Sequence, residues 1–318
     1  MPEFLVSYLR ALMSKWILKA IVQKGISFLP FSQKINFFFQ KYVTRGVYLS
    51  DEYFEDRLIH CREHYKQFRK YSSVNNFSHL EIGTGWYPVV PVGIFLYGAG
   101  SITTVDLNRL SNPELTHTTL RKFLEYHNNG KLEKLLPGIL EERLKIVLAE
   151  AENPSADFYN LLDNHNITYM VMDARKLHLT DASVDLITSN NTFEHIYPEV
   201  LEDILKEFKR LGKSGGVMSH AIDLSDHFAH MDKSITIYNF LKFSDAHWKC
   251  IDNSVQPQNR MRIYNYREMY AKQNIPVAEV INREINMDDY RKVNVNEKFL
   301  SHPSEENAVS HSQIVSVM

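Results

Sequence analysis

Apolar positions in the first seventy residues follow helical spacing. Between Phe4 and about Lys24 they recur every three or four residues, as on one face of an amphipathic helix, at Leu5, Leu9, Leu12, Trp16 and Ala20. An aromatic cluster at residues 37–42 follows the break at Pro30, and the charged residues 51–71 have the pattern of another helix. The sequence therefore predicts a helical arm over residues 1–70.

From residue 79 the pattern changes to short runs of β-forming residues separated by helical patterns. Strands are predicted at 79–82, 102–105, 167–172, 184–189 and 216–222. A helix is predicted at 198–211, because Pro198 suits the first helical position and acidic residues follow in the first turns. Strands that alternate with helices predict an α/β fold with a parallel sheet.

Two further segments stand apart from this alternation. Residues 108–166 are longer than an ordinary crossover connection between two strands, and they carry helical patterns at 120–126 and 139–151. We therefore expect a helical insertion that could cover the site. We place the main domain at residues 71–295. Residues 296–318, which contain Ser301-His302-Pro303-Ser304, are expected to form a loosely ordered tail.

Composition is that of an ordinary globular protein: of 318 residues, 44% are hydrophobic and 23% charged, which excludes wholesale disorder and low-complexity architectures. The two cysteines, Cys61 and Cys250, form neither a disulfide framework nor a zinc-binding pair, so we expect a reducing, cytoplasmic location. Residues 82–105 are uncharged and long enough to span a bilayer. However, Pro88, Pro91 and five glycines favour a strand, a loop and a helix.

Charge is distributed unevenly along the chain. Residues 1–50 hold seven basic residues and one acid, whereas the remainder holds 29 basic and 37 acidic residues, so we expect no nucleic-acid partner. Three interpretations of the basic segment are a lid packed on the domain, contact with an anionic membrane surface, and dimerisation. The lid ranks first, because apolar residues at helical spacing most often pack on a core, and peripheral membrane contact ranks second.

The clearest chemical signal is Leu80-Glu81-Ile82-Gly83-Thr84-Gly85 at the end of the first predicted strand. Glycines there let backbone amides approach a ligand, although a ligand-free turn would use them too. Asp106 closes the second strand 21 residues after Gly85, where an acid can accept hydrogen bonds from ribose hydroxyls. A nucleoside cofactor is favoured. NAD is disfavoured, because Pro88 stands where the dinucleotide motif has a glycine.

Three further signals follow in order. They are Asp173-Ala174 after the third strand, residues 190–195 after the fourth, and Leu211-Gly212-Lys213-Ser214-Gly215-Gly216 before the fifth. With the glycine loop and Asp106, they closely resemble the class I S-adenosylmethionine-dependent methyltransferases over residues 75–225. The resemblance implies a Rossmann-like, doubly wound, seven-stranded sheet with helices on both faces. It also implies that S-adenosyl-L-methionine lies across the carboxyl ends of the strands.

The resemblance also implies residue roles. Glu81, Gly83 and Gly85 would hold the methionine end of the cofactor, Asp106 the ribose, Asp173 and the Ala174 N–H the adenine, and the Asn190 carbonyl would line the sulfonium. Many family members have a third glycine where this chain has Tyr87, so we expect Trp86 or Tyr87 to pack over the methionine portion. A purely structural alternative for Asp173 is a helix N-cap.

Residues 221–232 follow the fifth strand and are dense in titratable groups. Methyl transfer to a hydroxyl requires a base, and we favour His227, oriented by Asp226 or Asp223, with His230 as the substitute. A solvated loop is the alternative. The spacing of His227, His230 and Asp232 also suits a divalent ion, but such spacings arise readily in polar loops, and we expect no metal.

Outside that loop, His195 is a candidate substrate contact, and a structural histidine is the equal alternative. Arg260 and Arg262 could clamp an anionic acceptor, with surface ion pairing as the alternative. We interpret the chain as a methyltransferase that acts on a small molecule or glycan at a hydroxyl. The rivals are N-methylation, a lipid-linked acceptor at the membrane, a non-catalytic cofactor-binding protein and, last, an NAD-dependent oxidoreductase.

Overall fold

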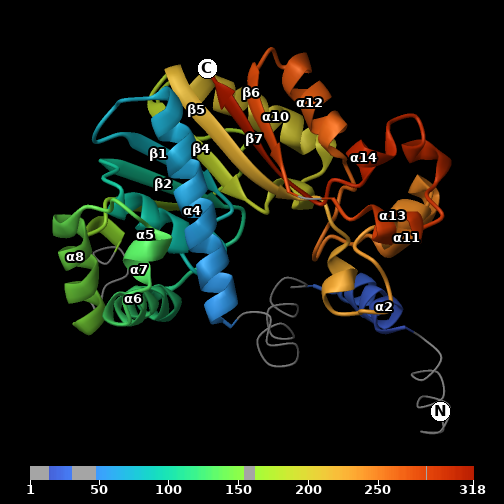
Figure 1. Ribbon diagram of the computed structural model, residues 1–318, viewed down its shortest axis with the longest axis horizontal. Helices are drawn as coiled ribbons and strands as arrows, with labels where there is room; N and C mark the ends of the chain where they lie inside the picture. The colour runs from blue at the N-terminus through green and yellow to red at the C-terminus, as the bar shows by residue number, and fades with distance from the viewer. Residues whose placement is uncertain (1–13, 31–47, 154–161, 284) are drawn as a thin grey trace, which may run out of the picture.

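A single sheet forms the centre of the molecule in the computed structural model, which describes residues 14–30, 48–153, 162–283 and 285–318. Its seven strands are β1 (Ser78–Ile82), β2 (Ser101–Asp106), β3 (Ile167–Val171), β4 (Val184–Asn190), β5 (Gly212–Asp223), β6 (Val277–Asn282) and β7 (His311–Val317) (Figure 1). Their order is β3-β2-β1-β4-β5-β7-β6, with β1 to β5 paired in parallel and β7 antiparallel to both of its neighbours. The predicted seven-stranded α/β sheet is confirmed.

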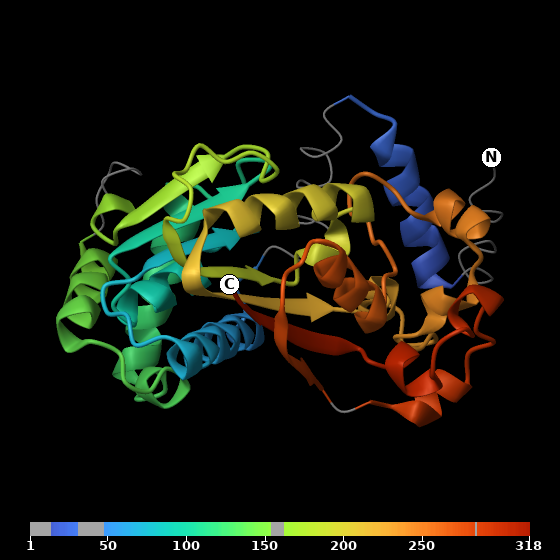
Figure 2. The same ribbon diagram turned by 90° about the horizontal axis from the view of Figure 1, so that it is seen from above.

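Helices cover both faces of this sheet. One face carries α4 (Asp51–Tyr71), α5 (Val89–Leu96), α6 (Pro113–Asn128), α7 (Leu132–Leu135) and α8 (Glu141–Glu152). The other carries α10 (Pro198–Leu211) and α12 (Ile263–Lys272), and Figure 2 shows α4 and α10 on opposite sides of the strands. Successive strand residues point to opposite faces, so Leu186 packs in the α4 cluster and Ile187 in the α10 cluster.

The helix predicted at residues 198–211 is confirmed as α10. Pro198 occupies its first turn, and the buried face follows helical spacing at Leu201, Ile204, Leu205 and Phe208. These side chains are the reason that the helix lies on the sheet, because their burial removes apolar surface from water.

A third apolar cluster lies beyond the carboxyl end of β5 and the start of β7. It joins α2 (Lys15–Ser27) to short elements of the C-terminal half: η2 (His227–His230), η3 (Asn239–Lys242), α11 (Asp245–Ile251), α13 (Met287–Arg291), η4 (Glu297–Phe299) and the end of α14 (Ser304–Asn307). The 3-10 helix η1 (Phe193–His195) belongs to the α10 side through Phe193. Trp16, Phe228 and Trp248 are among the buried members of the third cluster. The loops that follow β5 are therefore held by the N-terminal helix.

The arm predicted at residues 1–70 consists of two different parts where it is described. α4 belongs to the main core, because Phe54, Leu58 and Phe68 are fully buried against the sheet side of the domain. α2 contains the second half of the helix predicted from Phe4, whereas residues 1–13 and the aromatic cluster at 37–42 lie outside the described residues.

The insertion predicted at residues 108–166 supplies α6, α7 and α8, which pack against one another and against α4 and α5. These helices lie on the face of the sheet, so in its described part the insertion builds the core. None of the helices in the described ranges is both long enough and apolar enough to cross a membrane.

The prediction of a loosely ordered tail at residues 296–318 is wrong. Residues 311–317 form β7, which is hydrogen-bonded on both sides, and Ile314 and Val315 are fully buried in opposite faces of the sheet. The apolar run is short and surrounded by serines, so its intrinsic pattern is weak. Pairing with β5 and β6 overrides that weak local preference.

Candidate active site

A cavity of about 490 Å³ opens at the carboxyl ends of β1, β2 and β4; we call it the glycine-loop cavity. Six of the predicted site residues line it: Glu81, Gly83, Gly85, Asp106, Asn190 and His195. Because the carboxyl ends of adjacent parallel strands share one edge of the sheet, residues far apart in sequence meet there. Trp86 and Tyr87 line it as well.

The two glycines of this cavity both have a positive φ, which favours glycine. Gly83 has φ +80°, and a Cβ there would collide with the side chain of Thr192. Gly85 has φ +71°, and a Cβ would meet nothing within 4 Å, because this glycine faces the open cavity. The backbone at Gly85 is therefore exposed to whatever fills the cavity.

Asp106 lies at the end of β2, buried beside the glycine loop. Its Oδ2 accepts the Gly85 N–H at 3.1 Å and the Tyr169 hydroxyl at 3.4 Å. Burial raises the pKa of Asp106 to about 7, although the bonds from Gly85 and Tyr169 oppose that rise. The carboxyl group therefore titrates near neutral pH.

Glu81 begins a buried polar chain that reaches helix α4. It accepts from the Thr104 hydroxyl at 3.1 Å and from Asn190 Nδ2 at 3.2 Å, while burial raises the pKa of Glu81 to about 8. Asn190 Oδ1 lies 2.8 Å from His64 Nε2, and His64 Nδ1 lies 2.7 Å from Ser219 Oγ. Burial lowers the pKa of His64 to about 4, so its neutral ring donates through Nε2 and accepts through Nδ1.

Asp173 and Ala174 are not brought to the glycine-loop cavity. The Asp173 carboxylate binds its neighbour Arg175, with Nε to Oδ1 at 3.0 Å and Nη2 to Oδ2 at 2.5 Å, and also accepts the Arg175 N–H at 2.9 Å. Ala174 packs beside the α10 cluster. The adenine contacts expected of these two residues remain predictions, and the local bonds resemble the capping alternative.

A second cavity, of about 300 Å³, lies between α4 and the ends of β5, β6 and β7; we call it the histidine cavity. His60, His64, Arg283, His311 and Gln313 line it. Asn191, directly after β4, borders both cavities. Sequence reasoning missed His60, His64 and His311, because it assigns the helix at 51–71 to an arm and residues 296–318 to a tail.

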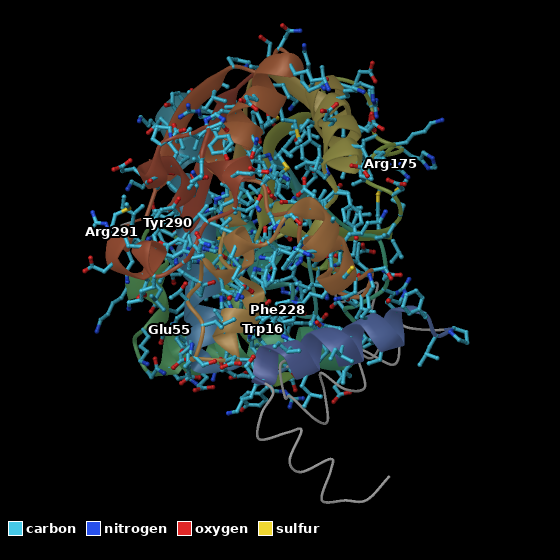
Figure 3. All side chains as sticks on the ribbon, turned by 90° about the vertical axis from the view of Figure 1, so that its right-hand side faces the viewer. Trp16, Glu55, Arg175, Phe228, Tyr290 and Arg291 are labelled. Atoms are coloured by element: carbon cyan, nitrogen blue, oxygen red, sulfur yellow. The ribbon has the colours of Figure 1, made fainter. Side chains whose placement is uncertain are left out.

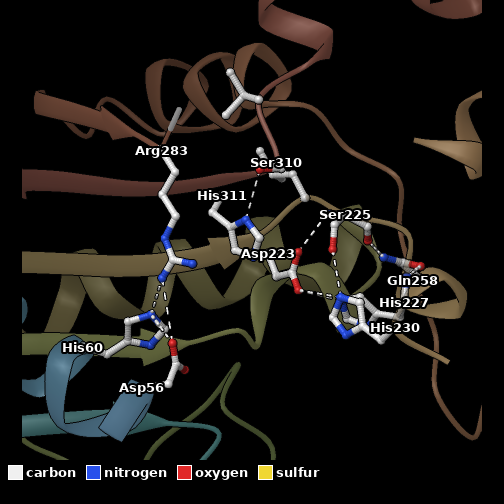
Figure 4. A network of polar contacts seen from close by, with 12 residues as sticks. Asp56, His60, Asp223, Ser225, His227, His230, Gln258, Arg283, Ser310 and His311 are labelled. Atoms are coloured by element: carbon white, nitrogen blue, oxygen red, sulfur yellow. Dashed lines mark hydrogen bonds and ion pairs between the residues drawn. The ribbon is translucent and has the colours of Figure 1, made fainter. Parts of the chain in front are cut away.

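Asp223, at the end of β5, is the centre of a group of imidazoles that we call the Asp223 cluster (Figure 4). Its Oδ2 lies 3.3 Å from His227 Nε2 and 3.9 Å from His230 Nε2, and its Oδ1 lies 3.5 Å from His311 Nε2. Burial alone would raise the pKa of Asp223, but the hydrogen bond and charge of His227 outweigh it and hold the pKa below its usual value. The carboxylate therefore stays ionised.

The three imidazoles of the cluster are placed differently. His311 lines the histidine cavity, and burial lowers its pKa. The His230 side chain is about half exposed, and partial burial lowers its pKa. His227 lines neither the glycine-loop cavity nor the histidine cavity. Its ring packs against that of His195, with 4.9 Å between the ring centroids. Of these three imidazoles, His311 is therefore the one that lines the histidine cavity.

Asp226 does not face His227 in the predicted way. Its Oδ1 accepts the Phe228 N–H at 2.8 Å, and its Oδ2 accepts Asn239 Nδ2 at 3.0 Å. It therefore caps the start of η2. Of the two predicted orienting acids, the structure places Asp223 beside the histidine.

Arg260 and Arg262 are buried, and neither lines the two cavities. Arg260 donates to the carbonyls of Phe240 and Phe243 and to Asp245, while Arg262 donates to the carbonyls of Leu224, Asn307 and Val309. Their donors are used to hold loops together. This placement does not support the predicted clamp on an anionic acceptor, because a guanidinium satisfied inside the fold cannot turn outward cheaply.

His195 lines the glycine-loop cavity, and a hydrogen bond to the backbone holds its ring in place. Its Nδ1 lies 2.7 Å from the carbonyl oxygen of Pro257, and burial lowers the pKa of His195 to about 4. The neutral ring therefore donates through Nδ1 and keeps the Nε2 lone pair.

Glu194, His195 and His227 place potential metal-ligand atoms within 4.8 Å of one another. Among the residues that the structure describes, neither carboxyl oxygen of the buried Glu194 has a hydrogen-bond partner. Burial raises the pKa of Glu194 well above its usual value, which favours the neutral acid. A neutral acid offers a cation little charge, so the absence of a metal remains our prediction.

A family model described as a methyltransferase domain matches residues 141–219, a span that runs from α8 through β4 and α10 into β5. The chain thus contains a stretch that matches a methyltransferase domain, in agreement with the resemblance found in its sequence. Its sheet order and the glycine-loop cavity agree with the fold and the cofactor edge that this family implies.

Solved structures of methyltransferases resemble this chain at low identity. One from Haloferax volcanii, in complex with the Trm112 activator, is 17% identical over 88% of this chain and 95% of its own, with a TM-score of 0.44. One from Methanosarcina mazei is 12% identical over 78% and 95%, with a TM-score of 0.43. One from Listeria monocytogenes is 11% identical over 80% and 97%, with a TM-score of 0.40. No curated protein matches the chain in sequence.

S-adenosyl-L-methionine is the cofactor that the resemblance to class I methyltransferases implies. Residues of the glycine-loop cavity fit such a molecule, because Gly85 leaves its backbone open toward the cavity and Asp106 offers a carboxylate beside it. The acids at 81 and 106 both have raised pKa values because they are buried, and an ammonium or ribose hydroxyls would favour their ionised forms.

Proposed function

We propose that this chain moves a methyl group to a hydroxyl of a small molecule or glycan that occupies the histidine cavity. One observation carries the proposal: the histidine cavity borders the glycine-loop cavity at Asn191 and contains an imidazole paired with an ionised acid. Two adjoining cavities, one for the donor and one for the acceptor, suit an in-line displacement.

When bound, S-adenosylmethionine supplies an electrophilic methyl group, so the protein has to orient the hydroxyl and accept its proton. We assign proton acceptance to the Asp223 cluster, in which the ionised Asp223 stabilises an imidazolium. His227 is the base predicted from the sequence. His311 is the second candidate, favoured because it lines the histidine cavity and lies 3.5 Å from Asp223 Oδ1.

Cofactor binding is assigned to the residues around the glycine loop. Glu81 and the open backbone at Gly85 would meet the methionine end, and Asp106 the ribose. His64 donates to the Asn190 side chain and so fixes the strand end that borders the cavity. Asn190 in turn donates to Glu81, so one buried chain of hydrogen bonds positions both residues.

A matched pair of glycine variants tests the cofactor site. Gly85 and Gly130 have nearly the same φ, +71° and +68°, and a Cβ at either meets nothing within 4 Å. Replacing each by Leu introduces the same backbone strain, but only Gly85→Leu puts a side chain into the glycine-loop cavity. Calorimetric titration with S-adenosylhomocysteine should show binding lost in Gly85→Leu and retained in Gly130→Leu.

The acceptor is tested by methyl transfer from labelled S-adenosylmethionine to matched hydroxyl and amine compounds of small-molecule and sugar type. Transfer to hydroxyls that is lost in His227→Ala or His311→Ala supports the proposal. Transfer to amines alone would reject the hydroxyl assignment and leave the methyltransferase assignment intact.

A further inference from the structure

Helix α2 has two apolar faces, only one of which packs on the protein. Trp16, Ala20, Gln23 and Ile26 are buried against η2 and α11. A second set of apolar side chains is exposed: Leu18 at 42%, Ile21 at 56%, Val22 at 41%, Phe28 at 78% and Leu29 at 49%. We call this set the α2 stripe.

The α2 stripe lies along one line of the helix. Its members are spaced by three, one, six and one residues, and the exposed Gly25 occupies the intervening turn. At 100° per residue Leu18, Ile21 and Val22 fall within an arc of about 100°, and Phe28 and Leu29 follow directly after the last turn of the helix. Single exposed apolar residues are ordinary on a protein surface, whereas a continuous row of five is not.

Contacts with the domain fix the direction in which the stripe points. The Trp16 N–H donates to Asp232 Oδ2 at 3.0 Å, and Lys24 Nζ donates to the carbonyl of Lys249 at 3.0 Å. Trp16 also packs against Phe228 with 5.9 Å between ring centroids. Figure 3 shows α2 along the edge of the molecule, with Trp16 beside Phe228. The stripe on the opposite side of the helix therefore faces outward.

All charged side chains of α2 itself are basic. α2 contains Lys15, Lys19 and Lys24 and no acid, and Lys15 is exposed at its start. Lys242 and Lys249, on the neighbouring η3 and α11, are exposed too. Apolar residues bordered by lysines are the pattern of a helix that lies in a bilayer interface and contacts anionic headgroups.

We propose that the α2 stripe docks on the surface of an anionic lipid bilayer. A second copy of this chain is disfavoured as the occupant, because two such surfaces would bring lysine borders of the same sign together. A bilayer surface supplies both the apolar layer and the opposite charge. The helix also contacts a loop of the proposed cofactor site, since Gln23 bonds Gln256, which lines the glycine-loop cavity. Docking would thus hold the active site close to the membrane.

Vesicle flotation tests this proposal with the full chain. Wild-type protein should float with phosphatidylcholine vesicles that contain 30% phosphatidylglycerol, and at least tenfold less with phosphatidylcholine alone or in 0.5 M salt. The triple variant Ile21→Ser, Val22→Ser, Phe28→Ser should lose at least tenfold in partitioning to the anionic vesicles. The matched control is Leu140→Ser with Ile146→Ser, two apolar residues of similar exposure near or on α8, which should float like wild type.

Two further measurements keep the result decisive. Binding of S-adenosylhomocysteine, measured on every variant, shows that the fold survives and is independent of the proposed acceptor. Light scattering reports the oligomeric state. Equal flotation of the triple variant and wild type, or no flotation of wild type, overturns the proposal. A dimer that dissociates in the triple variant would show instead that a second copy covers the stripe.

Discussion

The two cavities differ in how the chain builds them. The glycine-loop cavity is formed mainly by loops that directly follow β1, β2 and β4, so its residues sit in short motifs. The histidine cavity takes residues from the middle of α4, the ends of β5 and β6 and the start of β7. In a parallel sheet, the loops that follow the strands all lie at the same edge, so the motifs of the glycine-loop cavity meet there. The histidine cavity forms only when distant segments of the chain pack together. The proposed cofactor site is thus encoded by local motifs, whereas the proposed acceptor site depends on contacts between distant segments.

The largest effect expected is on the rate of methyl transfer, when an imidazole of the Asp223 cluster is removed. His227→Ala or His311→Ala should lower the rate by about 10²–10⁴ if the altered imidazole is the base, with S-adenosylhomocysteine affinity nearly unchanged. Initial-rate kinetics with a hydroxyl acceptor provide the measurement. His178→Ala, an exposed histidine after β3, serves as the control. If both variants keep rates within a few-fold of wild type, the Asp223 cluster is not the proton acceptor.

A second prediction concerns the glycine-loop cavity and should affect binding. Asp106→Ala should weaken S-adenosylhomocysteine binding by about two orders of magnitude, because two ribose hydroxyls lose their acceptor at about 1–3 kcal/mol each. Calorimetric titration measures the affinity.

The same titration on Asp173→Ala tests the predicted adenine contact. An affinity loss there would support the adenine contact predicted from the sequence, whereas no change would leave Asp173 as the partner of Arg175 only.

The pH dependence of cofactor binding should separate the cavities further. Because the pKa of Asp106 is raised to about 7, its carboxylate is lost as pH falls below 7, and the affinity for S-adenosylhomocysteine should fall with it. One linked proton corresponds to about tenfold per pH unit at most. Asp106→Asn should flatten the profile between pH 7 and 5. A profile that is identical in wild type and Asp106→Asn would show that another group controls it.

A smaller effect is expected when the N-terminal segment is removed. Deleting residues 1–47 keeps Ser50, whose hydroxyl caps α4 by accepting the Tyr53 N–H. The S-adenosylhomocysteine affinity should stay within about tenfold, or 1.4 kcal/mol, while turnover on the acceptor falls because the loops around Phe228 lose their support. A truncated protein that cannot bind the cofactor would contradict this separation.

The smallest expected effect is that of chelation. Dialysis against EDTA should leave turnover within about twofold, because the buried Glu194 favours its neutral form and offers a cation little charge. Activity that disappears and returns with Mg²⁺ or Mn²⁺ would instead assign a metal to Glu194, His195 and His227.

Much of the fold could be predicted because its signals are local. The helix at 198–211 and the turn at Gly83 are each encoded within a few residues, by Pro198 and helical spacing in one case and by glycine conformation in the other. His64, His311 and β7 could not be predicted. Their roles depend on partners in distant parts of the sequence, such as Asn190, which is 126 residues from His64, and nothing in their own neighbourhood marks them.

The position of β7 has a consequence for the newly made chain. β7 lies between β5 and β6, which both precede it in sequence, so β5 keeps an unpaired edge and β6 has no neighbour until residues 311–317 have been synthesised. An unpaired edge strand is a template for pairing with other chains. A nascent chain that pauses before residue 311 should therefore be prone to aggregation, and it would also lack the histidine that joins Asp223 to the histidine cavity.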